Sequence, residues 1–192
     1  MPQDNRLPGH LLFATDLSAR CDRAQDRAVA LARAWGAKLT VVHALDMLDA
    51  PNDQPSRPTA AGGVQRALRV MQADFADAGD IAPDFVVLEG KPQKVVLEVA
   101  EDRACDMIVT GIAGNSPLGQ TVLGSTVTAL SRHAPVPVLV VKRRPRAEYG
   151  HILVASDFSR ASKRFAPSAR CGRTEGASGR FRRVCDADLI FA

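Results

Sequence analysis

Apolar and polar residues follow two alternating patterns along residues 10–142. Short continuous apolar runs bounded by polar residues predict buried strands. We predict five, over residues 10–15, 39–44, 83–88, 106–110 and 137–141. In the segments between them, apolar residues recur every three or four positions, as on one face of an amphipathic helix. These segments predict helices over residues 18–35, 64–75, 91–101 and 125–133.

The first helix has a clear stripe and a clear end. Ala24, Ala28, Leu31 and Trp35 fall on one helical face, and Gly36 stands where a helix ends in the left-handed conformation. Residues 46–63 have a different composition, rich in Asp, Asn, Pro and Gly, and predict a long mobile loop.

Regular alternation of strand and helix predicts an α/β fold: a five-stranded parallel doubly wound sheet with helices on both faces. Its crossovers should be right-handed. Ligands bind such sheets outside the carboxyl ends of the strands, where the strand order switches. We therefore expect the loops after the first, second and fourth strands to meet there. Asp16, Ala44 and Gly111 stand at those three ends.

An internal repeat divides the chain. Residues 10–18 read HLLFATDLS and residues 151–159 read HILVASDFS, so a second copy of the unit begins near residue 151. After Phe165 the sequence is rich in Arg, Gly and Ser and has no helical stripe. The predicted organisation is given by four ranges: a main domain over 1–143, a linker over 144–150, the start of a second copy over 151–165, and an irregular tail over 166–192, disordered or frame-shifted.

Composition excludes several classes of protein. The net charge of +4 comes from residues 151–192, because residues 1–150 carry equal numbers of basic and acidic side chains. Nucleic-acid binding by the main domain is therefore not expected. No apolar run is long enough to span a membrane and no signal peptide is recognisable, which points to the cytoplasm. The cysteines, Cys21, Cys105, Cys171 and Cys185, are too far apart for a metal motif and are expected to be free thiols.

The candidate chemistry lies in residues 110–126, TGIAGNSPLGQTVLGST, with the spacing G-x2-G-x9-G-[ST]. Gly111 and Gly114 follow a strand directly and allow the backbone to approach a ligand closely. Gly124, Ser125 and Thr126 open the next helix, whose free amides and dipole suit an anion. The pattern predicts a phosphate site. It is neither a Walker loop nor a dinucleotide fingerprint.

Several of these residues also have a purely structural interpretation. Asp16 would then only cap the first helix, and Ser125 only the fourth. The interpretation we favour for the remaining candidates is structural: His43 as a packed strand-end residue, His133 as a helix-end residue, Trp35 as core, and Arg143, Arg144 and Arg146 as a solvated linker.

Taken together, these residues resemble the nucleotide-binding branch of the universal stress protein family. The resemblance covers residues 10–142. It rests on six segments: the strand endings FATDLS and VVHALD, the GKP turn at 90–92, the CDMIVTG strand, the glycine pattern, and the ending APVPVLVVK. It implies a Rossmann-like fold of the adenine nucleotide α-hydrolase-like type. The repeat at residue 151 resembles tandem members of the family, here with an incomplete second domain.

The resemblance also implies a nucleotide site with ATP as ligand. Asp16, after Thr15, would lie near the ribose and any Mg²⁺, which it would hold indirectly, and the Ala44 backbone would contact adenine. Thr110 and Gly111 would flank the ribose and phosphates. The phosphate cradle would be formed by Gly114, Gly124, Ser125 and Thr126. Ala113 departs from the family, because ATP-binding relatives often have His or Arg there, and this implies weaker binding.

The function expected from this resemblance is a stress-response, ATP-binding regulator with little or no turnover. No lysine for the β- and γ-phosphates and no activating base occurs in motif form, so we expect at most slow ATP hydrolysis. The alternative is a dimerisation scaffold with an empty pocket. The strand at 137–141 would be an exposed sheet edge, and family members dimerise through it, so a homodimer through Val138 and Val140 is expected.

Overall fold

Six strands form one mixed sheet in a computed structural model that describes residues 7–45, 60–112, 124–145 and 189–191. The strands are β1 (His10–Thr15), β2 (Lys38–Leu45), β3 (Asp84–Glu89), β4 (Met107–Gly111), β5 (Val138–Val141) and β6 (Leu189–Phe191). Their order is β3-β2-β1-β4-β5-β6. The first five are parallel to their neighbours, and β6 runs antiparallel to β5.

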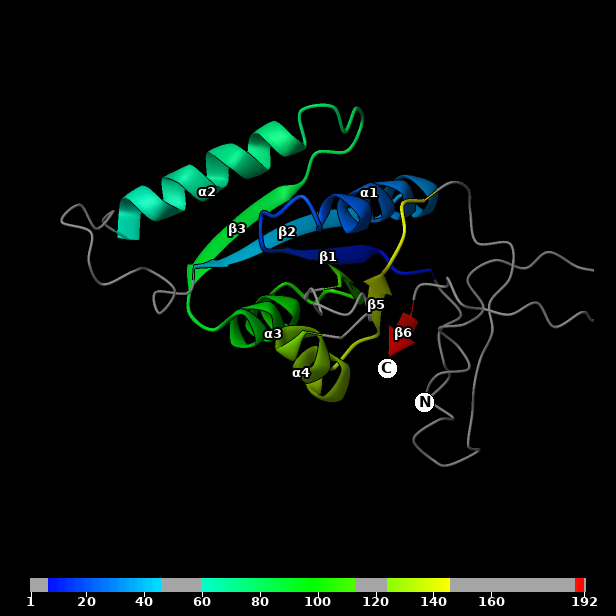
Figure 1. Cartoon of the computed structure of the whole chain (residues 1–192). Coiled ribbons are helices and arrows are strands. Elements are labelled where there is room, and N and C mark those ends of the chain that lie inside the picture. The colour runs from blue at the N-terminus through cyan, green and yellow to red at the C-terminus, as the bar shows by residue number, and fades with distance from the viewer. Residues whose placement is uncertain (1–6, 46–59, 113–123, 146–188, 192) are drawn as a thin grey trace, which may run out of the picture.

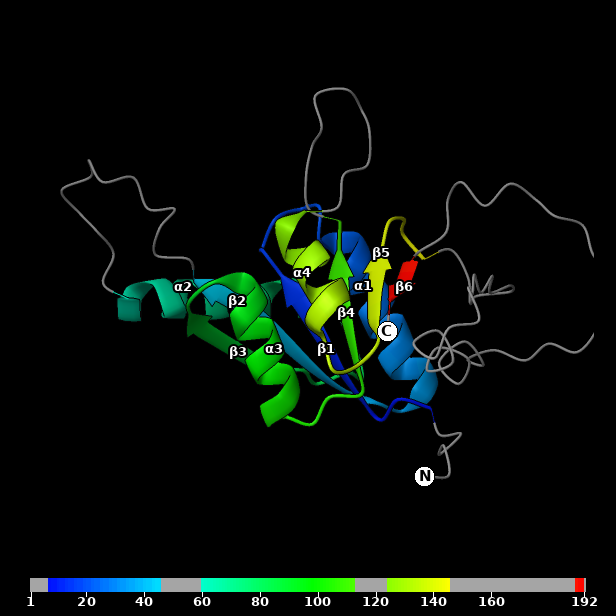
Figure 2. The same ribbon diagram turned by 90° about the horizontal axis from the view of Figure 1, so that it is seen from below.

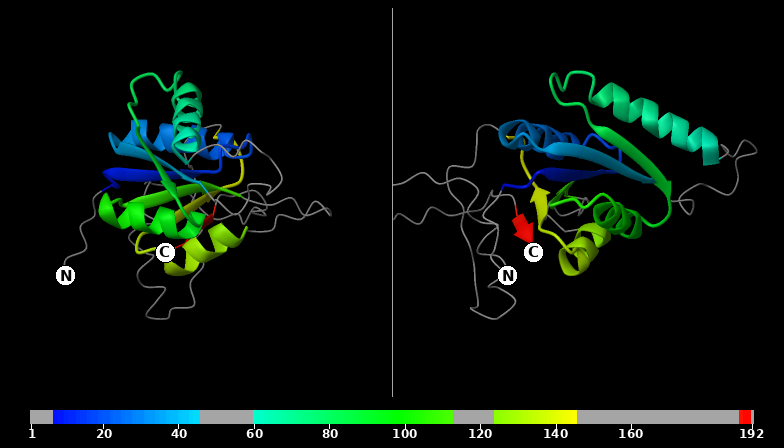
Figure 3. Two further views of the ribbon diagram at one scale, coloured as in Figure 1. Left: turned by 90° about the vertical axis from the view of Figure 1, so that its left-hand side faces the viewer. Right: turned by 180° about the vertical axis from the view of Figure 1, so that it is seen from behind.

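Four helices cover the two faces of this sheet. They are α1 (Asp22–Trp35), α2 (Ala60–Asp74), α3 (Pro92–Asp102) and α4 (Ser125–His133). Figure 1 shows α1 and α2 on one face and α3 and α4 on the other, and the same layers appear from the side and from behind in Figure 3. The predicted fold, a five-stranded parallel doubly wound sheet with helices on both faces, is confirmed for β1–β5.

The continuous apolar runs are explained by two cores. Leu11 and Phe13 of β1 belong to the core under α1 and α2, whereas Leu12 and Ala14 belong to the core over α3 and α4. Successive side chains of a strand point to opposite faces, so a strand covered on both faces must be apolar at every position.

Two helix starts differ from the prediction. Helix α1 begins at Asp22 and not at Ser18, because the Ser18 amide and hydroxyl are bonded to Asp16 in the preceding turn. Helix α2 begins at Ala60, so residues 60–63, predicted as loop, are helical. A Cβ built on Gly63 would lie 3.5 Å from Leu45 Cδ1, so this turn packs against the end of β2. Packing here outweighs the low helix propensity of glycine.

The prediction that β5 is an edge strand is wrong. Strand β6, which lies in the tail predicted to be irregular, pairs with β5 on the side away from β4. The side chains of Val138 and Val140, predicted to mediate a dimer, are 1% and 0% exposed and fill the core over α3 and α4. Side chains of a strand point to the faces of a sheet, so only the backbone is presented at its edge.

Several predictions fall outside the described residues. These are the loop 46–59, Ala113 and Gly114, the linker after residue 145, the second copy over 151–165, and the tail over 166–188. The domain boundaries therefore stay predictions. Within the part of the chain that the structure describes, no helix combines the length and apolar character that crossing a bilayer requires.

Candidate functional site

The sheet has a topological switch point between β1 and β4. Strand β1 pairs with β2 on one side and with β4 on the other, with Ala14 opposite Thr110 and Thr15 opposite His43. From β1 the chain crosses to β2 through α1, and from β4 it reaches β5 through α4 on the opposite face. Where two such connections diverge, a ligand crevice is expected at the carboxyl ends of the two strands, here β1 and β4. Figure 2 shows the arrowheads of β1, β4 and β5 on the same side of the molecule.

The loop after β1 holds the Asp16 carboxylate in one orientation. Asp16 Oδ1 accepts hydrogen bonds from the Ser18 amide at 2.9 Å, the Ser18 hydroxyl at 2.6 Å and the Cys21 thiol at 3.1 Å. Thr15 Oγ1 accepts a hydrogen bond from the Leu17 amide at 3.0 Å. Leu17 has φ 59°, in the left-handed region that branched and bulky residues avoid, so the turn is tightly defined.

These contacts also explain the protonation states of the two groups. Partial burial raises the pKa of Asp16, but hydrogen bonds from Ser18 and Cys21 outweigh it and the pKa lies below its ordinary value. Burial raises the pKa of Cys21 to about 11, so its thiol stays protonated and remains a donor to Asp16. Asp16 is therefore a fixed negative charge at neutral pH.

Asp16 does not cap the first helix. The N-cap of α1 is Cys21, whose side chain makes no capping hydrogen bond, and the Asp16 contacts all lie within the preceding turn. Since the carboxylate does not cap the start of the helix, the structural interpretation of Asp16 as an N-cap is wrong. Its Oδ1 atom takes all three of these bonds, which leaves Oδ2 as the oxygen available to a ligand.

On the opposite side of the crevice, Gly111 ends β4 against the loop after β1. A Cβ added to Gly111 would lie 3.5 Å from Cys21 Sγ and 3.6 Å from the Arg20 carbonyl oxygen. Larger side chains would push into the turn that holds Asp16. The Thr110 side chain is buried, and its hydroxyl lies 3.4 Å from the Gly111 carbonyl oxygen. The end of β4 is thus in direct contact with the loop that follows β1.

Helix α4 begins without a side-chain cap. Its N-cap residue is Gly124, in an extended conformation, and Ser125 and Thr126 are the first two helical residues. The interpretation of Ser125 as the N-cap is therefore wrong. Because glycine has no side chain, the N-cap residue offers no oxygen to the amides of the first turn, and an anion can take that place. A helix that leads from β4 to the parallel β5 must start at the carboxyl edge of the sheet, beside the crevice.

The third side of the site is the end of β2. Ala44 lies one position beyond the pair of Thr15 and His43, level with Asp16. The His43 Nδ1 atom lies 3.0 Å from the Thr15 carbonyl oxygen, so this histidine ties the two strand ends together. Its packed, structural interpretation agrees with this contact. The Gly90 amide bonds the Leu45 carbonyl oxygen at 3.0 Å and fixes the neighbouring turn in the same way.

This geometry can be compared with known proteins. The sequence profile of the universal stress protein family matches residues 9–142. The chain belongs to this family. A universal stress protein of Thermus aquaticus is 34% identical over 133 residues, which cover 69% of this chain and 97% of that protein.

Solved structures of universal stress proteins have the same fold. One, crystallised in complex with cAMP, has a TM-score of 0.55 and 25% identity, covering 71% of this chain and 98% of its own. Another, from Archaeoglobus fulgidus in complex with dAMP, has a TM-score of 0.52 and 21% identity, covering 68% of this chain and 94% of its own. This universal stress protein therefore has the family's Rossmann-like α/β fold.

The structure brings together most of the predicted site residues and adds others. Thr15, Asp16, Ala44, Thr110 and Gly111 lie at adjoining strand ends. Gly114 is outside the described residues. Ser18 and Cys21 were not predicted as part of the site. The Asp-x-Ser spacing is a recognised signal for a turn closed by a side chain and could have identified Ser18, whereas nothing in the sequence links Cys21 to Asp16.

Metal binding at this site would depend on the ligand. Within the described residues, no group of three or more His, Cys, Asp or Glu side chains could hold a metal ion. One carboxylate fits the way Mg²⁺ usually binds with nucleotides, through phosphates, waters and one or two acidic side chains. Asp16 is thus suited to an indirect contact with the ion and not to holding it alone.

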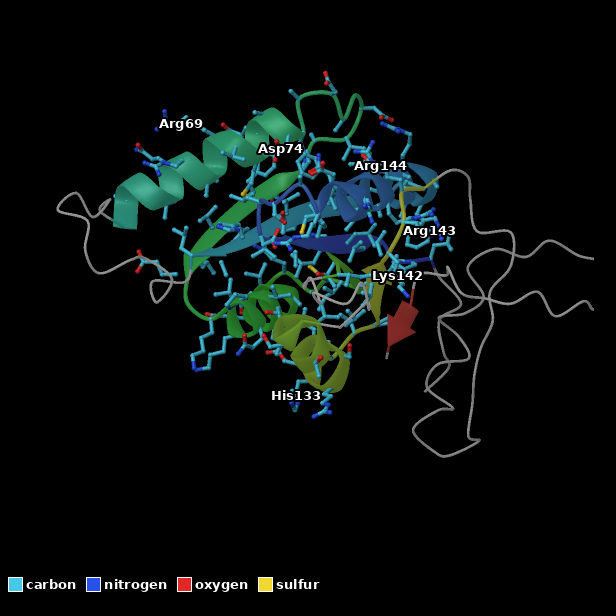
Figure 4. All side chains as sticks on the ribbon, viewed as in Figure 1. Arg69, Asp74, His133, Lys142, Arg143 and Arg144 are labelled. Carbon is cyan, nitrogen blue, oxygen red and sulfur yellow. The ribbon has the colours of Figure 1, made fainter. Side chains whose placement is uncertain are left out.

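The basic residues after β5 are partly structural. Arg144 lies 3.3 Å from Asp26 and 3.9 Å from Asp22, two acids of α1, and the Arg23 side chain donates to the Lys142 carbonyl oxygen at 3.2 Å. Figure 4 shows Lys142, Arg143 and Arg144 together at this end of β5, and His133 at the end of α4. The interpretation of Arg144 as simply solvated is thus incomplete, because its ion pairs dock the segment after β5 onto α1.

Proposed function

We propose that this universal stress protein binds an adenine nucleotide, with ATP as the first candidate, in the crevice between β1 and β4. The observation that carries the proposal is the pairing of two features at one switch point: a carboxylate fixed by Ser18 and Cys21, and an uncapped helix start at Gly124. A carboxylate accepts hydrogen bonds from ribose hydroxyls, and a helix N-terminus attracts phosphates. The relative in complex with cAMP supports the choice of an adenine nucleotide.

Each element would then have a separate part in binding. The Ala44 backbone at the end of β2 would contact the base, and Asp16 Oδ2 the ribose. Thr110 and Gly111 would flank the ribose and phosphates, and Gly114, Gly124, Ser125 and Thr126 would cradle the phosphates. When Mg²⁺ accompanies ATP, it neutralises phosphate charge, and Asp16 would hold it indirectly.

The proposed role is regulatory and not catalytic. The described residues of the crevice offer one fixed acid, Asp16, whose lowered pKa makes it a poor general base. We expect ATP turnover well below the roughly 1–100 per second of kinases. Binding would change the surface that a partner sees, in a stress response in the cytoplasm. A robust ATPase rate that disappears in Asp16→Asn would contradict this part of the proposal.

Isothermal titration of Mg-ATP into the protein tests the site directly. We expect micromolar binding in the unmodified chain and a loss of about 100-fold or more in Gly124→Val, because the added side chain blocks the approach of phosphates to the first-turn amides. Thr128→Val is the matched control, since it adds the same residue to the same helix one turn further along. Equal affinity in all three proteins, or no heat in any of them, would contradict the site.

The structure does not support the premise of the alternative function, a dimerisation scaffold. It depended on β5 as an exposed edge, and β6 occupies that edge. Pairing between the β5 strands of two chains cannot form while β6 is in place. Nucleotide binding is therefore the function that the described geometry supports best.

A further inference from the structure

Positive charge gathers around Gly111, at the carboxyl end of β4. Arg20, in the loop after β1, comes close through its backbone, because a Cβ added to Gly111 would lie 3.6 Å from the Arg20 carbonyl oxygen. On the other side, Gly111 pairs with Val141, the last residue of β5, and Lys142 stands one position beyond that pair. Two basic residues therefore flank the end of β4, one from the loop before α1 and one from the end of β5.

A third basic residue is fixed at the same place. The Arg23 guanidinium donates a hydrogen bond from Nη1 to the Lys142 carbonyl oxygen at 3.2 Å, which joins the first turn of α1 to the end of β5. Arg20 and Arg23 are both exposed, and Figure 4 shows Lys142 where β5 ends. We call these three residues, Arg20, Arg23 and Lys142, the basic rim.

The two nearby acids of α1 are paired with a residue outside the basic rim. Arg144 lies 3.3 Å from Asp26 and 3.9 Å from Asp22. Their negative charge is therefore balanced by Arg144, and the basic rim keeps its own positive charge. Like charges held together at one end of a sheet create a local potential that attracts an anion.

The charge of Arg20 reaches the carboxylate of the crevice. Burial raises the pKa of Asp16, hydrogen bonds from Ser18 and Cys21 lower it, and the positive charge of Arg20 lowers it further. Within the described residues, the Arg20 guanidinium makes no hydrogen bond or ion pair. Its donors are thus available to a ligand that lies against Gly111.

The residues proposed to cradle the phosphates have no positive side chain. Gly114 and Gly124 have no side chain at all, and Ser125 and Thr126 have neutral hydroxyls. The start of a helix contributes only about half an elementary charge. Each further phosphate of a nucleotide adds negative charge that these groups do not balance, so a cation beside them should matter most for the most highly charged ligand.

We propose that the basic rim, with Arg20 as its principal member, selects ligands of the crevice by phosphate number, so that a nucleoside triphosphate binds more tightly than a monophosphate. This inference rests on the proposed nucleotide site. A guanidinium binds phosphate oxygens through charge-assisted and frequently bidentate hydrogen bonds. Arg20 is the principal member because its loop contacts Gly111 directly, whereas Arg23 already uses one N–H on the Lys142 carbonyl oxygen.

Titration calorimetry of adenosine, AMP, ADP and ATP, at one Mg²⁺ concentration, tests the basic rim in the unmodified chain and in Arg20→Gln. Glutamine keeps a polar side chain but has no charge. We expect the affinity for ATP to fall about tenfold, that for ADP about threefold, that for AMP less, and that for adenosine not at all.

Arg69→Gln is the matched control, because it makes the same substitution on α2. Arg69 bonds the Gln65 carbonyl oxygen of its own helix at 3.4 Å, and Figure 4 shows it far from Lys142. This variant should bind each ligand like the unmodified chain. Equal affinity for ATP in Arg20→Gln and Arg69→Gln would overturn the inference and leave the nucleotide site itself standing.

Inorganic tripolyphosphate is the second probe, since it carries the phosphate charge without a base. We expect it to bind Arg20→Gln at least about tenfold more weakly than the unmodified chain. Such a loss without any binding of ATP would contradict the nucleotide site and support the basic rim. An equal loss for adenosine and ATP would overturn the inference, because Arg20 would then act only through the fold of its loop. No binding of ATP or tripolyphosphate to the unmodified chain would overturn both proposals.

Discussion

The two sides of the crevice present different chemical groups to a ligand. On the β1 side, the group proposed to contact the nucleotide is a side chain, the Asp16 carboxylate, which the Ser18 hydroxyl and the Cys21 thiol hold in place. On the side of β4 and α4, the proposed contacts are made by the backbone at Gly111 and Gly124, which have no side chain. A side-chain contact tolerates exchange for a residue with similar hydrogen bonding, whereas a backbone contact is lost when a bulky side chain is added to the glycine. Substitutions on the two sides should therefore fail in different ways.

The largest effect on ATP affinity after Gly124→Val is expected at Gly111. In Gly111→Val the Cβ alone would make ordinary contact with Cys21, but the γ-methyl groups would push into the loop that holds Asp16. We expect ATP binding to weaken by about 30-fold or more, with a loss of about 1–3 kcal/mol in the free energy of unfolding from overpacking. Titration calorimetry and urea denaturation measure the two quantities.

Gly111→Ala provides the control for this prediction. The added Cβ lies 3.5–3.6 Å from its nearest neighbours, which is ordinary contact, so the folded structure should accept it. We expect nearly unchanged stability and a smaller loss of affinity. If Gly111→Val binds ATP as tightly as the unmodified chain, the backbone side does not approach the ligand.

A smaller effect is expected from Asp16→Asn. The amide is isosteric and keeps an oxygen for Ser18 and Cys21, but it loses the charge that strengthens a hydrogen bond to a ribose hydroxyl. We expect binding to weaken by about tenfold, equivalent to about 1.4 kcal/mol. The control is Asp77→Asn, which removes an acid from the segment after α2, away from the crevice. The same change in both variants would show an effect of net charge and not of position.

The smallest effect is expected at Cys21. Cys21→Ala removes one of three donors to Asp16 and should weaken ATP binding by about threefold, in line with the modest net contribution of one hydrogen bond. Cys21→Ser keeps a donor at the same place and should restore affinity. If serine and alanine behave alike, Cys21 acts through packing and not by orienting Asp16.

The alkaline stability of the protein provides a second readout of the thiol. The pKa of Cys21 is raised from 9.0 to about 11 in the folded chain, so folding favours the protonated form. Its contribution is complete below pH 9 and is lost as the pH rises from 9 through 11. Burial also raises the pKa of Cys105 to about 11, so the comparison needs Cys21→Ser in the same background. We expect the free energy of unfolding of this variant to fall less between pH 8 and pH 10.5 than that of the unmodified chain.

Local patterns sufficed for most of the fold. The runs at 10–15 and 137–141 and the helix at 125–133 agree closely with β1, β5 and α4. The end of α1 was also predictable from Gly36, because glycine favours the left-handed conformation that ends a helix. In the structure Gly36 has φ 61° and its amide bonds the carbonyl oxygens of Ala32 and Arg33. The start of α2 was not, since two glycines argue against a helix and only packing against Leu45 favours one.

The site was predicted in outline and not in its contacts. The positions of Asp16, Ala44 and Gly111 at adjoining strand ends follow from topology, which the alternation of elements already predicts. The bond between Cys21 and Asp16 depends on how one turn folds back against β4. A thiol donor five residues from its acceptor leaves no sequence pattern.

Hydrophobic periodicity and glycine placement were enough to predict an α/β unit and to single out a candidate anion-binding loop, because each is a local property of the chain. Strand order, the state of the β5 edge and the protonation of Asp16 and Cys21 required the tertiary structure. These properties arise between residues far apart in the sequence. Leu139 meets Ile190 through backbone groups that every residue carries, so side-chain identity alone could not predict that contact.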